Sequence, residues 1–252
     1  ATMSRIKHTV VDLIRHGQPE GGNLYRGHTI DDPLSDKGWQ QMHAAVQGAA
    51  PWQQIISSPM QRCLAFAKQL ARQHAIPLAI ETDFREVGFG NWEGLTREQL
   101  KAERLQEYQE FYRDPVNCRP PGAEPLDAFM TRVADGFVEM LDRHSGAAVL
   151  VVAHAGVIRA ILAHVLDIPP ASMYRIHVAN AGISRLHTNR DVTLPTQCRL
   201  REGTGRINSF RAAASKDPAE YGRPELDRFV RTGAYDKHRV WAKTERNPED
   251  GR

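Results

Sequence analysis

Few features of this sequence indicate a disulfide framework or a structural metal site. The 252 residues contain only three cysteines, Cys63, Cys118 and Cys198, which are far apart and form no CxxC pair. This spacing favours reduced thiols and a cytoplasmic location over a disulfide framework or a zinc site. The chain also has no HxH, HExxH or Asp-rich segment with the spacing of metal ligands. We therefore expect no metal and no cofactor.

Long apolar runs and blocks of like charge are also missing. No run approaches the roughly 20 apolar residues that span a bilayer, and the N-terminal "ATMSRIKHTV" has no apolar core of a signal peptide. The net charge is +3, without a dense basic segment, so we expect neither a nucleic acid nor a membrane as partner. The contents of 41% hydrophobic and 25% charged residues are typical of a globular protein with a proper core.

Up to residue 188 the pattern alternates between strands and helices. Such alternation predicts an α/β fold: a three-layer sandwich with a mainly parallel central sheet, helices on both faces and a polar helical cap. Ser35 has the position of a helix N-cap, and Pro59 that of the first residue of the next helix. The expected strands are 8–14, 53–58, 78–82, 147–153, 172–179 and 182–188, and the expected helices are 34–47, 59–74, 157–166 and two within the cap, 96–144.

The composition changes after residue 188. Residues 189–252 have few apolar side chains, many arginines and scattered glycine and proline. We therefore divide the chain into a catalytic domain, 1–188, and a polar C-terminal extension, 189–252. The extension could be poorly ordered, or it could be an arm that docks on a neighbouring subunit, and its composition favours the first interpretation.

Five polar side chains follow the ends of predicted strands. Arg15 and His16 end the strand "VVDLIRHG", His154 ends "AAVLVVAHAG", Arg62 lies in the first turns of the helix after "QQIISS", and Glu86 lies in the loop after "LAIET". One such residue would usually have only a structural role. Because the carboxyl ends of parallel strands meet at one edge of the sheet, we expect all five to lie together there.

The composition of this set suggests a phosphate monoester as its target. Two arginines offer planar forks for phosphate oxygens, and the helix N-termini after "RHG" and "AHAG" add backbone N–H groups. A neutral imidazole is a competent nucleophile toward phosphorus, and nearby arginines should keep a histidine deprotonated. A carboxylic acid can protonate the leaving alkoxide and then activate water. These groups form a complete phosphomonoesterase without a metal.

Four segments together resemble one known family. "LIRHG", "SSPMQR", "REVGFGNWEG" and "VVAHAG" occur in the order and with the spacing of the histidine phosphatase, or phosphoglycerate-mutase-like, superfamily. The resemblance spans roughly residues 8–188, and the segment after 189 has no counterpart in it. It implies a helical cap and the phosphoglycerate-mutase-like fold.

The resemblance also implies a role for each of the five residues. His16 corresponds to the nucleophile that becomes phosphorylated, and Glu86 to the proton donor. Arg15, Arg62 and His154 correspond to the residues that bind the phosphoryl group. The protein would then be a metal-independent histidine acid-type phosphatase.

Further substrate contacts are expected around the nucleophile. By resemblance, Arg26 and Gly27 in "YRGHTIDDPLSDKG" match the family's substrate-contacting segment, and Asn23 could belong to it. Gly17 would let the backbone approach the phosphate closely, and Ala155 would offer a backbone N–H at a helix N-terminus.

The segment around Glu86 distinguishes phosphatases from mutases in this family. Mutases resemble "ERHYGxLxG" there, whereas this chain has "REVGFGNWEG", as in the phosphatases. "RGHTIDDPLSDKGW" with "FGNWEG" most resembles the α-ribazole phosphatase group, which acts late in cobalamin biosynthesis. The predicted substrate is α-ribazole 5′-phosphate, with a broad-specificity histidine phosphatase or a phosphoglycerate mutase as alternatives.

Two other classes of function are less favoured. A metal-dependent hydrolase lacks a ligand cluster here, and an inactive phosphate-binding module would have no need of every catalytic position. The expected partner is a small phosphate monoester, and the sequence is compatible with a homodimer.

Overall fold

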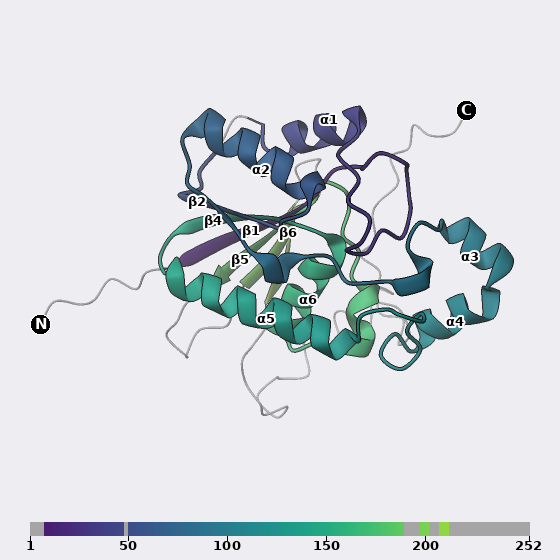
Figure 1. Ribbon diagram of the computed structural model, residues 1–252. Coiled ribbons are helices and arrows are strands. Elements are labelled where there is room, and N and C mark those ends of the chain that lie inside the picture. The colour runs from purple at the N-terminus through teal and green to yellow at the C-terminus, as the bar shows by residue number, and fades with distance from the viewer. Residues whose placement is uncertain (1–7, 48–49, 189–196, 202–206, 212–252) are drawn as a thin grey trace, which may run out of the picture. The chain divides into compact units, whose positions relative to one another are not determined.

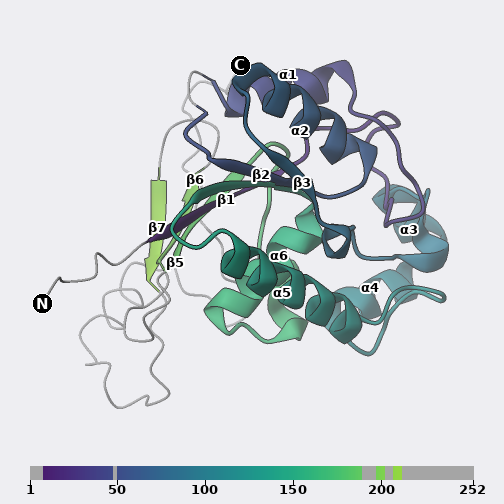
Figure 2. The ribbon, with the colours of Figure 1, turned by 60° about the vertical axis from the view of Figure 1, so that its left-hand side comes forward.

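Our computed structural model describes residues 8–47, 50–188, 197–201 and 207–211. The chain divides into two units, Ala1–Ala214 and Ser215–Arg252, and all described residues belong to the first. Seven strands among the described residues form one sheet, in the order β3-β2-β4-β1-β5-β6-β7 (Figures 1 and 2). They are β1 (Thr9–Arg15), β2 (Gln54–Ser57), β3 (Leu78–Ile80), β4 (Ala148–Ala153), β5 (Ile183–Thr188), β6 (Gln197–Arg201) and β7 (Ile207–Arg211).

The strands that carry the predicted chemistry are parallel to one another. β2 pairs in parallel with β3 and β4, and β4 pairs in parallel with β1. Strands β5, β6 and β7 continue the sheet in antiparallel pairing. The carboxyl ends of four neighbouring strands therefore lie along one edge, as the alternating pattern predicts.

Helices cover both faces of this sheet, which confirms the predicted α/β sandwich. Helices α1 and α2 lie on one face, α5 and α6 lie on the other, and α3 and α4 lie beyond the sheet as a cap (Figure 1). The predicted cap over 96–144 is therefore wrong for α5, because the apolar side of this helix packs in the core on the sheet face. The helices are α1 (Asp36–Ala45), α2 (Gln61–His74), α3 (Arg97–Glu103), α4 (Leu105–Arg113), α5 (Leu126–Arg143) and α6 (Ala155–Leu166). Three 3₁₀ helices are η1 (Thr82–Phe84), η2 (Gly90–Trp92) and η3 (Pro170–Arg175).

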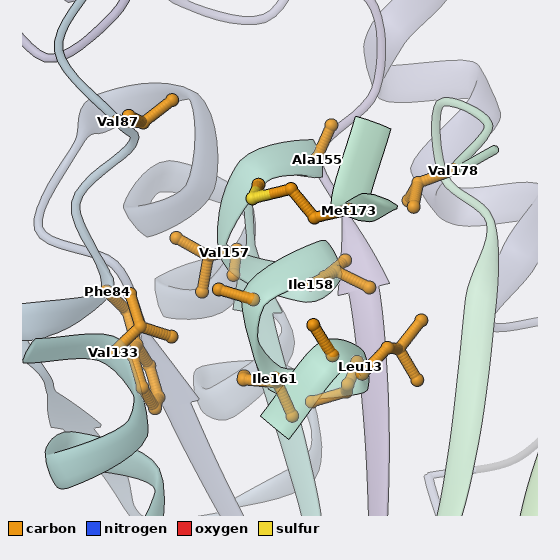
Figure 3. Close-up of a cluster of buried hydrophobic side chains, with 14 of the residues drawn as sticks. Leu13, Phe84, Val87, Val133, Ala155, Val157, Ile158, Ile161, Met173 and Val178 are labelled. Carbon is orange, nitrogen blue, oxygen red and sulfur yellow. The ribbon is translucent and has the colours of Figure 1, made fainter. Parts of the chain in front are cut away.

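Each face of the sheet has its own apolar core. Leu13 and the α6 residues Ile158 and Ile161 belong to the core under α5 and α6 (Figure 3). Ile14 and Leu150 belong to the core under α1 and α2. A parallel strand buried on both faces reads as a continuous apolar run, which explains "AVLVVA" in β4. This double core fixes the strand ends firmly.

Local predictions are confirmed at some helix ends and wrong at others. Ser35 is the N-cap of α1, where its hydroxyl accepts a hydrogen bond from the Gly38 N–H at 3.1 Å. Helix α2 begins at Gln61 rather than Pro59, with Met60 as its N-cap. The expected strand 172–179 is also wrong. The 3₁₀ helix η3 begins before it, at Pro170, whose fixed φ favours a helical turn, and continues to Arg175.

The sheet continues past the predicted domain boundary at residue 188. Strand β6 pairs with β5, with Ile183 opposite Arg201, and β7 pairs with β6. Most of the extension, 189–252, lies outside the described residues, so its order and the boundary at 188 stay predictions. No helix of the described chain has the length and apolar character to cross a membrane.

Candidate active site

The register of β1 and β4 brings the two predicted histidines together. Arg15 lies opposite Ala153 at the ends of these strands, and the N–H of His16 donates to the Ala153 carbonyl at 3.0 Å. The residues that follow the two strand ends are His16 and His154. Their ring centroids are 5.2 Å apart and the ring planes meet at 65°. Parallel pairing, rather than sequence proximity, therefore creates the centre of the site.

The imidazole of His16 is oriented by its own neighbour in the chain. Its Nδ1–H donates to the carbonyl of Gly17 at 2.7 Å, since a carbonyl can only accept. Burial, followed by the charges of Arg15 and Arg62, holds the pKa of His16 well below its usual value. The ring is therefore neutral at pH 7, with an unprotonated Nε2. This is the state that a nucleophilic histidine requires.

Two arginines, the half-buried Arg15 and the buried Arg62, hold fixed positions around His16. Arg15 donates through Nη1 to the carbonyl of Val178 at 2.7 Å. Arg62 donates to the carbonyls of Ile30 and Gly27, at 2.8 and 2.9 Å. Burial, followed by repulsion from Arg159 on α6, lowers the pKa of Arg15 to about 10. Arg15 therefore stays charged at neutral pH. Among the described residues only three buried side-chain nitrogens or oxygens lack a hydrogen-bond partner, and two are the Nε atoms of these arginines.

Glu86 reaches the same site from the loop after β3. Its Oε1 accepts from the Val87 N–H at 2.9 Å, and its Oε2 accepts from the N–H of Gly156 at 3.2 Å. Gly156 lies in the first turn of α6, and a Cβ there would overlap the Glu86 carboxylate. The helix N-terminus thus positions the carboxylate. Glu86 is half-buried and so remains open to solvent at one side.

A second pair of charged residues supports the Glu86 loop. Arg132 of α5 donates to the carbonyls of Asp83, Arg85 and Glu86, and forms an ion pair with Glu124 at 2.7 Å. Glu124 in turn accepts from the N–H of Gly88 at 3.2 Å. The sequence did not single out Arg132, because an arginine within an amphipathic helix normally faces solvent. Glu124 directly precedes Pro125, the N-cap of α5.

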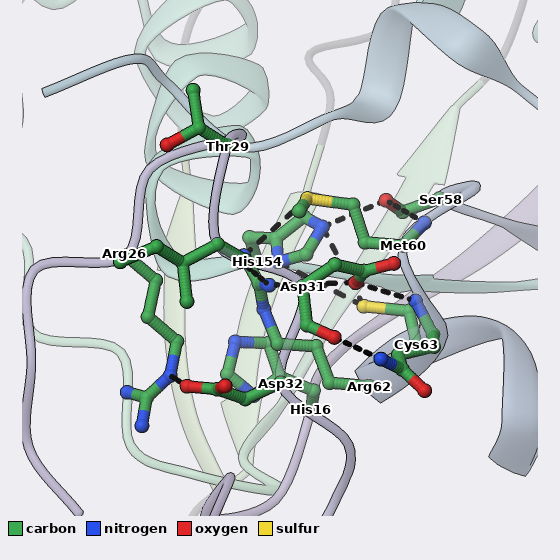
Figure 4. Close-up of polar contacts among 12 residues, drawn as sticks. His16, Arg26, Thr29, Asp31, Asp32, Ser58, Met60, Arg62, Cys63 and His154 are labelled. Atoms are coloured by element: carbon green, nitrogen blue, oxygen red, sulfur yellow. Dashed lines mark hydrogen bonds and ion pairs between the residues drawn. The ribbon is translucent and has the colours of Figure 1, made fainter. Parts of the chain in front are cut away.

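His154 is held by a serine from the neighbouring strand end. Its Nε2 lies 2.7 Å from the Ser58 hydroxyl (Figure 4). Burial, followed by the charge of Arg62, holds the pKa of His154 well below its usual value. The structure thus gives Ser58 a contact with the site that the sequence did not indicate. A serine before a proline has many structural explanations, so no signal in the sequence identified this contact.

The glycine of the Arg-His-Gly segment meets another glycine. A Cβ at Gly17 would overlap the carbonyl of Gly38 in α1, and a Cβ at Gly38 would overlap the carbonyl of Gln18. Close backbone packing against α1 is therefore sufficient to require glycine at position 17. The expected approach of Gly17 to a phosphate stays a prediction.

The remaining predicted substrate residues lie in different surroundings. Arg26 is buried and donates to Asp32 at 2.8 Å and to the Glu20 carbonyl, so its guanidinium holds its own loop together (Figure 4). Gly27 has a φ of +55° and supplies the carbonyl that Arg62 contacts. Asn23 is exposed, and no contact with the five central residues is found for it. Ala155 is the first residue of α6, beside His154.

Metal ligands do not gather in the part of the chain that the structure describes. Within it, no group of three or more His, Cys, Asp or Glu side chains is placed to hold a metal ion. The side chains that do converge are two histidines, two arginines and one carboxylate. They offer a nucleophile, fixed positive charge and a proton carrier within one small region.

Comparison with known proteins identifies, over most of the chain, the same family that the four sequence segments resemble. The model of the histidine phosphatase superfamily (branch 1) matches residues 11–197. The adenosylcobalamin/alpha-ribazole phosphatase of Salmonella typhimurium is 31% identical over 172 residues, which cover 66% of this chain and 84% of that protein. The native structure of a mycobacterial glucosyl-3-phosphoglycerate phosphatase has a TM-score of 0.64 at 26% identity, over 71% of this chain and 90% of that one.

Another relative is longer than the region it shares. A bifunctional protein of Mycobacterium tuberculosis is 35% identical over 179 residues, which cover 68% of this chain but 48% of that protein. This chain therefore spans about half the length of the mycobacterial relatives that it matches at this identity.

Proposed function

Because this chain belongs to the histidine phosphatase superfamily, we propose that it hydrolyses a small phosphate monoester through a phosphohistidine on His16. One observation carries the proposal. The neutral, oriented imidazole of His16 lies in the field of Arg15 and Arg62, whose buried Nε donors have no partner among the described residues. Such donors suit the oxygens of a transferring phosphoryl group.

The proposed reaction has two steps. In the first, Nε2 of His16 attacks phosphorus, the bond from phosphorus to the ester oxygen breaks, and Glu86 gives its proton to the leaving alkoxide. In the second, Glu86 takes a proton from water while the water oxygen attacks phosphorus. The P–N bond then breaks, and its electron pair returns to His16. Arg15, Arg62 and His154 hold the equatorial oxygens in both steps.

The leaving group is proposed to be α-ribazole. The support is the segment "RGHTIDDPLSDKGW" together with "FGNWEG", and the printed name of the relative from Salmonella typhimurium. The loop 18–34 and the segment 96–125, which contains α3 and α4, would form its pocket. They meet where the hydroxyls of Tyr25 and Tyr112 lie 2.7 Å apart. Glucosyl-3-phosphoglycerate is a second candidate, because the structural neighbour carries that name.

A substrate panel tests this proposal. Phosphate release would be measured in EDTA with α-ribazole 5′-phosphate, glucosyl-3-phosphoglycerate, 3-phosphoglycerate and p-nitrophenyl phosphate. We expect full activity in EDTA and a kcat/KM for α-ribazole 5′-phosphate far above the rest. Equal values across the panel would replace this substrate with broad specificity. Isomerisation of 3-phosphoglycerate would favour a mutase, and dependence on a metal would contradict the mechanism.

The His16→Ala protein is the control for the panel. We expect it to lose hydrolysis of every substrate while it keeps the fold, measured by circular dichroism. A cytoplasmic location, a role in cobalamin biosynthesis and a homodimer remain predictions, which cell fractionation, deletion of the gene and light scattering would test.

A further inference from the structure

Ser58 lies between two elements of the site without being one of the groups used so far. It follows β2, is fully buried, and its N–H donates to the Val152 carbonyl of β4 at 3.0 Å. This pairing places its hydroxyl 2.7 Å from Nε2 of His154 (Figure 4). The contact joins the ends of two neighbouring parallel strands.

The hydrogen atoms around this hydroxyl can be assigned. The N–H of Met60 donates to the Ser58 Oγ at 3.3 Å, so the oxygen already accepts one bond. The hydroxyl proton can then go to Nε2 of His154 or to the sulfur of Cys63, which also lies beside it. Burial raises the pKa of the Cys63 thiol, whose S–H donates to the carbonyl of Ala153 at 3.4 Å. Because sulfur is the weaker acceptor, the proton goes to Nε2.

Because Nε2 of His154 accepts this hydrogen bond, the position of the hydrogen on the ring follows. The pKa of His154 is held well below its usual value by burial and Arg62, so the ring carries a single N–H. With Nε2 accepting, that N–H is on Nδ1. The Cys63 sulfur, a weak acceptor, lies 3.8 Å from Nδ1 and 3.6 Å from Nε2. Since the Ser58 hydroxyl occupies Nε2, Nδ1 is the nitrogen that has no strong partner among the described residues and is left for a ligand.

We propose that Ser58 is a positioning residue that fixes the Nδ1–H tautomer of His154, so that this histidine donates to the transferring phosphoryl group. The inference rests on the proposed function, because only a phosphoryl oxygen in the site requires a donor there. A phosphoryl oxygen accepts hydrogen bonds, and the opposite tautomer would turn a lone pair toward it. The serine thus selects which of two neutral forms of His154 the site contains.

The tautomer can be measured directly in the wild-type protein. A long-range ¹H–¹⁵N spectrum distinguishes protonated from unprotonated ring nitrogens, and the His154 signals are identified by their loss in His154→Gln. We expect Nδ1–H in the wild type and a mixture of tautomers in Ser58→Ala, with kcat/KM for p-nitrophenyl phosphate reduced about tenfold. Ser57→Ala is the matched control, because the equally buried Ser57 hydroxyl donates to the Ser58 carbonyl instead of to His154.

The outcomes separate this inference from the proposed function. An Nε2–H signal in the wild type overturns it, and so does a Ser58→Ala protein with wild-type tautomer and kcat/KM. If Ser58→Ala fails to fold, the wild-type spectrum alone decides. That spectrum is recorded without substrate, so it stands apart from the His16→Ala assay, which decides the proposed function.

Discussion

The side chains of the site use only part of their hydrogen-bonding capacity to hold their own positions. Both Nη groups of Arg62 donate to backbone carbonyls. Nδ1 of His16 and one Nη of Arg15 also donate to backbone carbonyls. Within the part of the chain that the structure describes, the Nε of each arginine has no partner, and the Nε2 of His16 is left for a ligand. Groups fixed in this way need little reorganisation when charge develops on a phosphoryl group, which is the main source of electrostatic catalysis.

The role of Glu86 can be tested by varying the leaving group. Glu86→Gln keeps the shape of the side chain but cannot give up a proton. We expect kcat/KM for an alkyl phosphate to fall by roughly 10²-fold or more, because its alkoxide needs a proton in the transition state. The kcat/KM for p-nitrophenyl phosphate should change little, since p-nitrophenolate leaves unaided. Equal losses on both substrates would show that Glu86 is not the proton donor.

At the scale of residues, the residues at the centre of the site could be predicted from the sequence, whereas the residues that position them could not. Arg15, His16 and His154 were identifiable because each combines an unusual side chain with the end of an apolar strand. Ser58 was not, because its contact depends on the register between β2 and β4. Arg26 was identified by resemblance, yet its guanidinium binds its own loop.

At the scale of elements, one helix joins the Glu86 loop to the core. Helix α5 packs on α6 through the apolar core. Its Arg132 donates to the carbonyls of Asp83, Arg85 and Glu86 and forms an ion pair with Glu124. Glu86 therefore depends on α5 for its position, although within the described part of the chain its carboxylate accepts from the N–H groups of Val87 and Gly156 and not from α5.

Replacement of Arg132 tests this dependence. Arg132→Gln removes the ion pair with Glu124 and the guanidinium that donates to the backbone carbonyls of the Glu86 loop. We therefore expect kcat/KM for alkyl phosphates to fall about tenfold, with a smaller effect on p-nitrophenyl phosphate. Arg143→Gln on the same helix is the control, because its ion pair with Glu139 is exposed. We expect no change there. Unchanged kcat/KM in Arg132→Gln would mean that the Glu86 loop keeps its conformation without Arg132.

Elements with strong periodicity were predictable, and elements set by proline were not. The apolar run of β4 and the capped helix α1 were identified with nearly correct bounds. The segment 172–179 has β-forming residues, but Pro169 and Pro170 start a 3₁₀ helix before it. Helix α2 begins two residues after the expected position, at Gln61, and its N-cap Met60 has no side chain that could cap the helix.

At the scale of the whole sheet, a buried charge joins its parallel and antiparallel parts. Asp12 of β1 is 1% exposed, and it accepts from Arg185 of β5 at 2.7 Å and from the indole of Trp52 at 2.8 Å. Asp12 lies four residues before His16, which is roughly 13 Å along a strand. The cluster therefore contributes to the fold rather than to the chemistry.

Substitution of this carboxylate should change stability alone. Asp12→Asn removes the charged acceptor of the Arg185 and Trp52 hydrogen bonds, and we expect the free energy of unfolding to fall by about 1.5–3 kcal/mol. Urea unfolding measures this loss. The kcat/KM of the folded protein should be unchanged, and a selective loss of kcat/KM at wild-type stability would contradict a purely structural role.

The buried histidines also predict how stability depends on pH. The pKa values of His16 and His154 are lowered in the folded protein, so below about pH 6.5 the unfolded chain binds protons that the folded chain does not. Their contribution is complete above that pH and is lost as the pH falls, by up to ~1.4 kcal/mol per pH unit for each histidine.

Urea unfolding between pH 7.5 and 5.5 measures this slope. His16→Asn should reduce it, whereas His177→Asn, at an exposed position, should leave it unchanged. An equal slope in all three proteins would mean that His16 takes up its proton in the folded state as readily as in the unfolded chain.

The nucleophile is tested most directly by trapping the phosphorylated protein. Glu86→Gln would be mixed with p-nitrophenyl phosphate, quenched in alkali to preserve phosphohistidine, and mapped by peptide mass spectrometry. Phosphorylation should remain fast in this variant while attack by water is slow, so close to one phosphate per chain should accumulate on His16. Phosphate on another residue, or p-nitrophenol release without any phosphorylated protein, would contradict a phosphohistidine on His16.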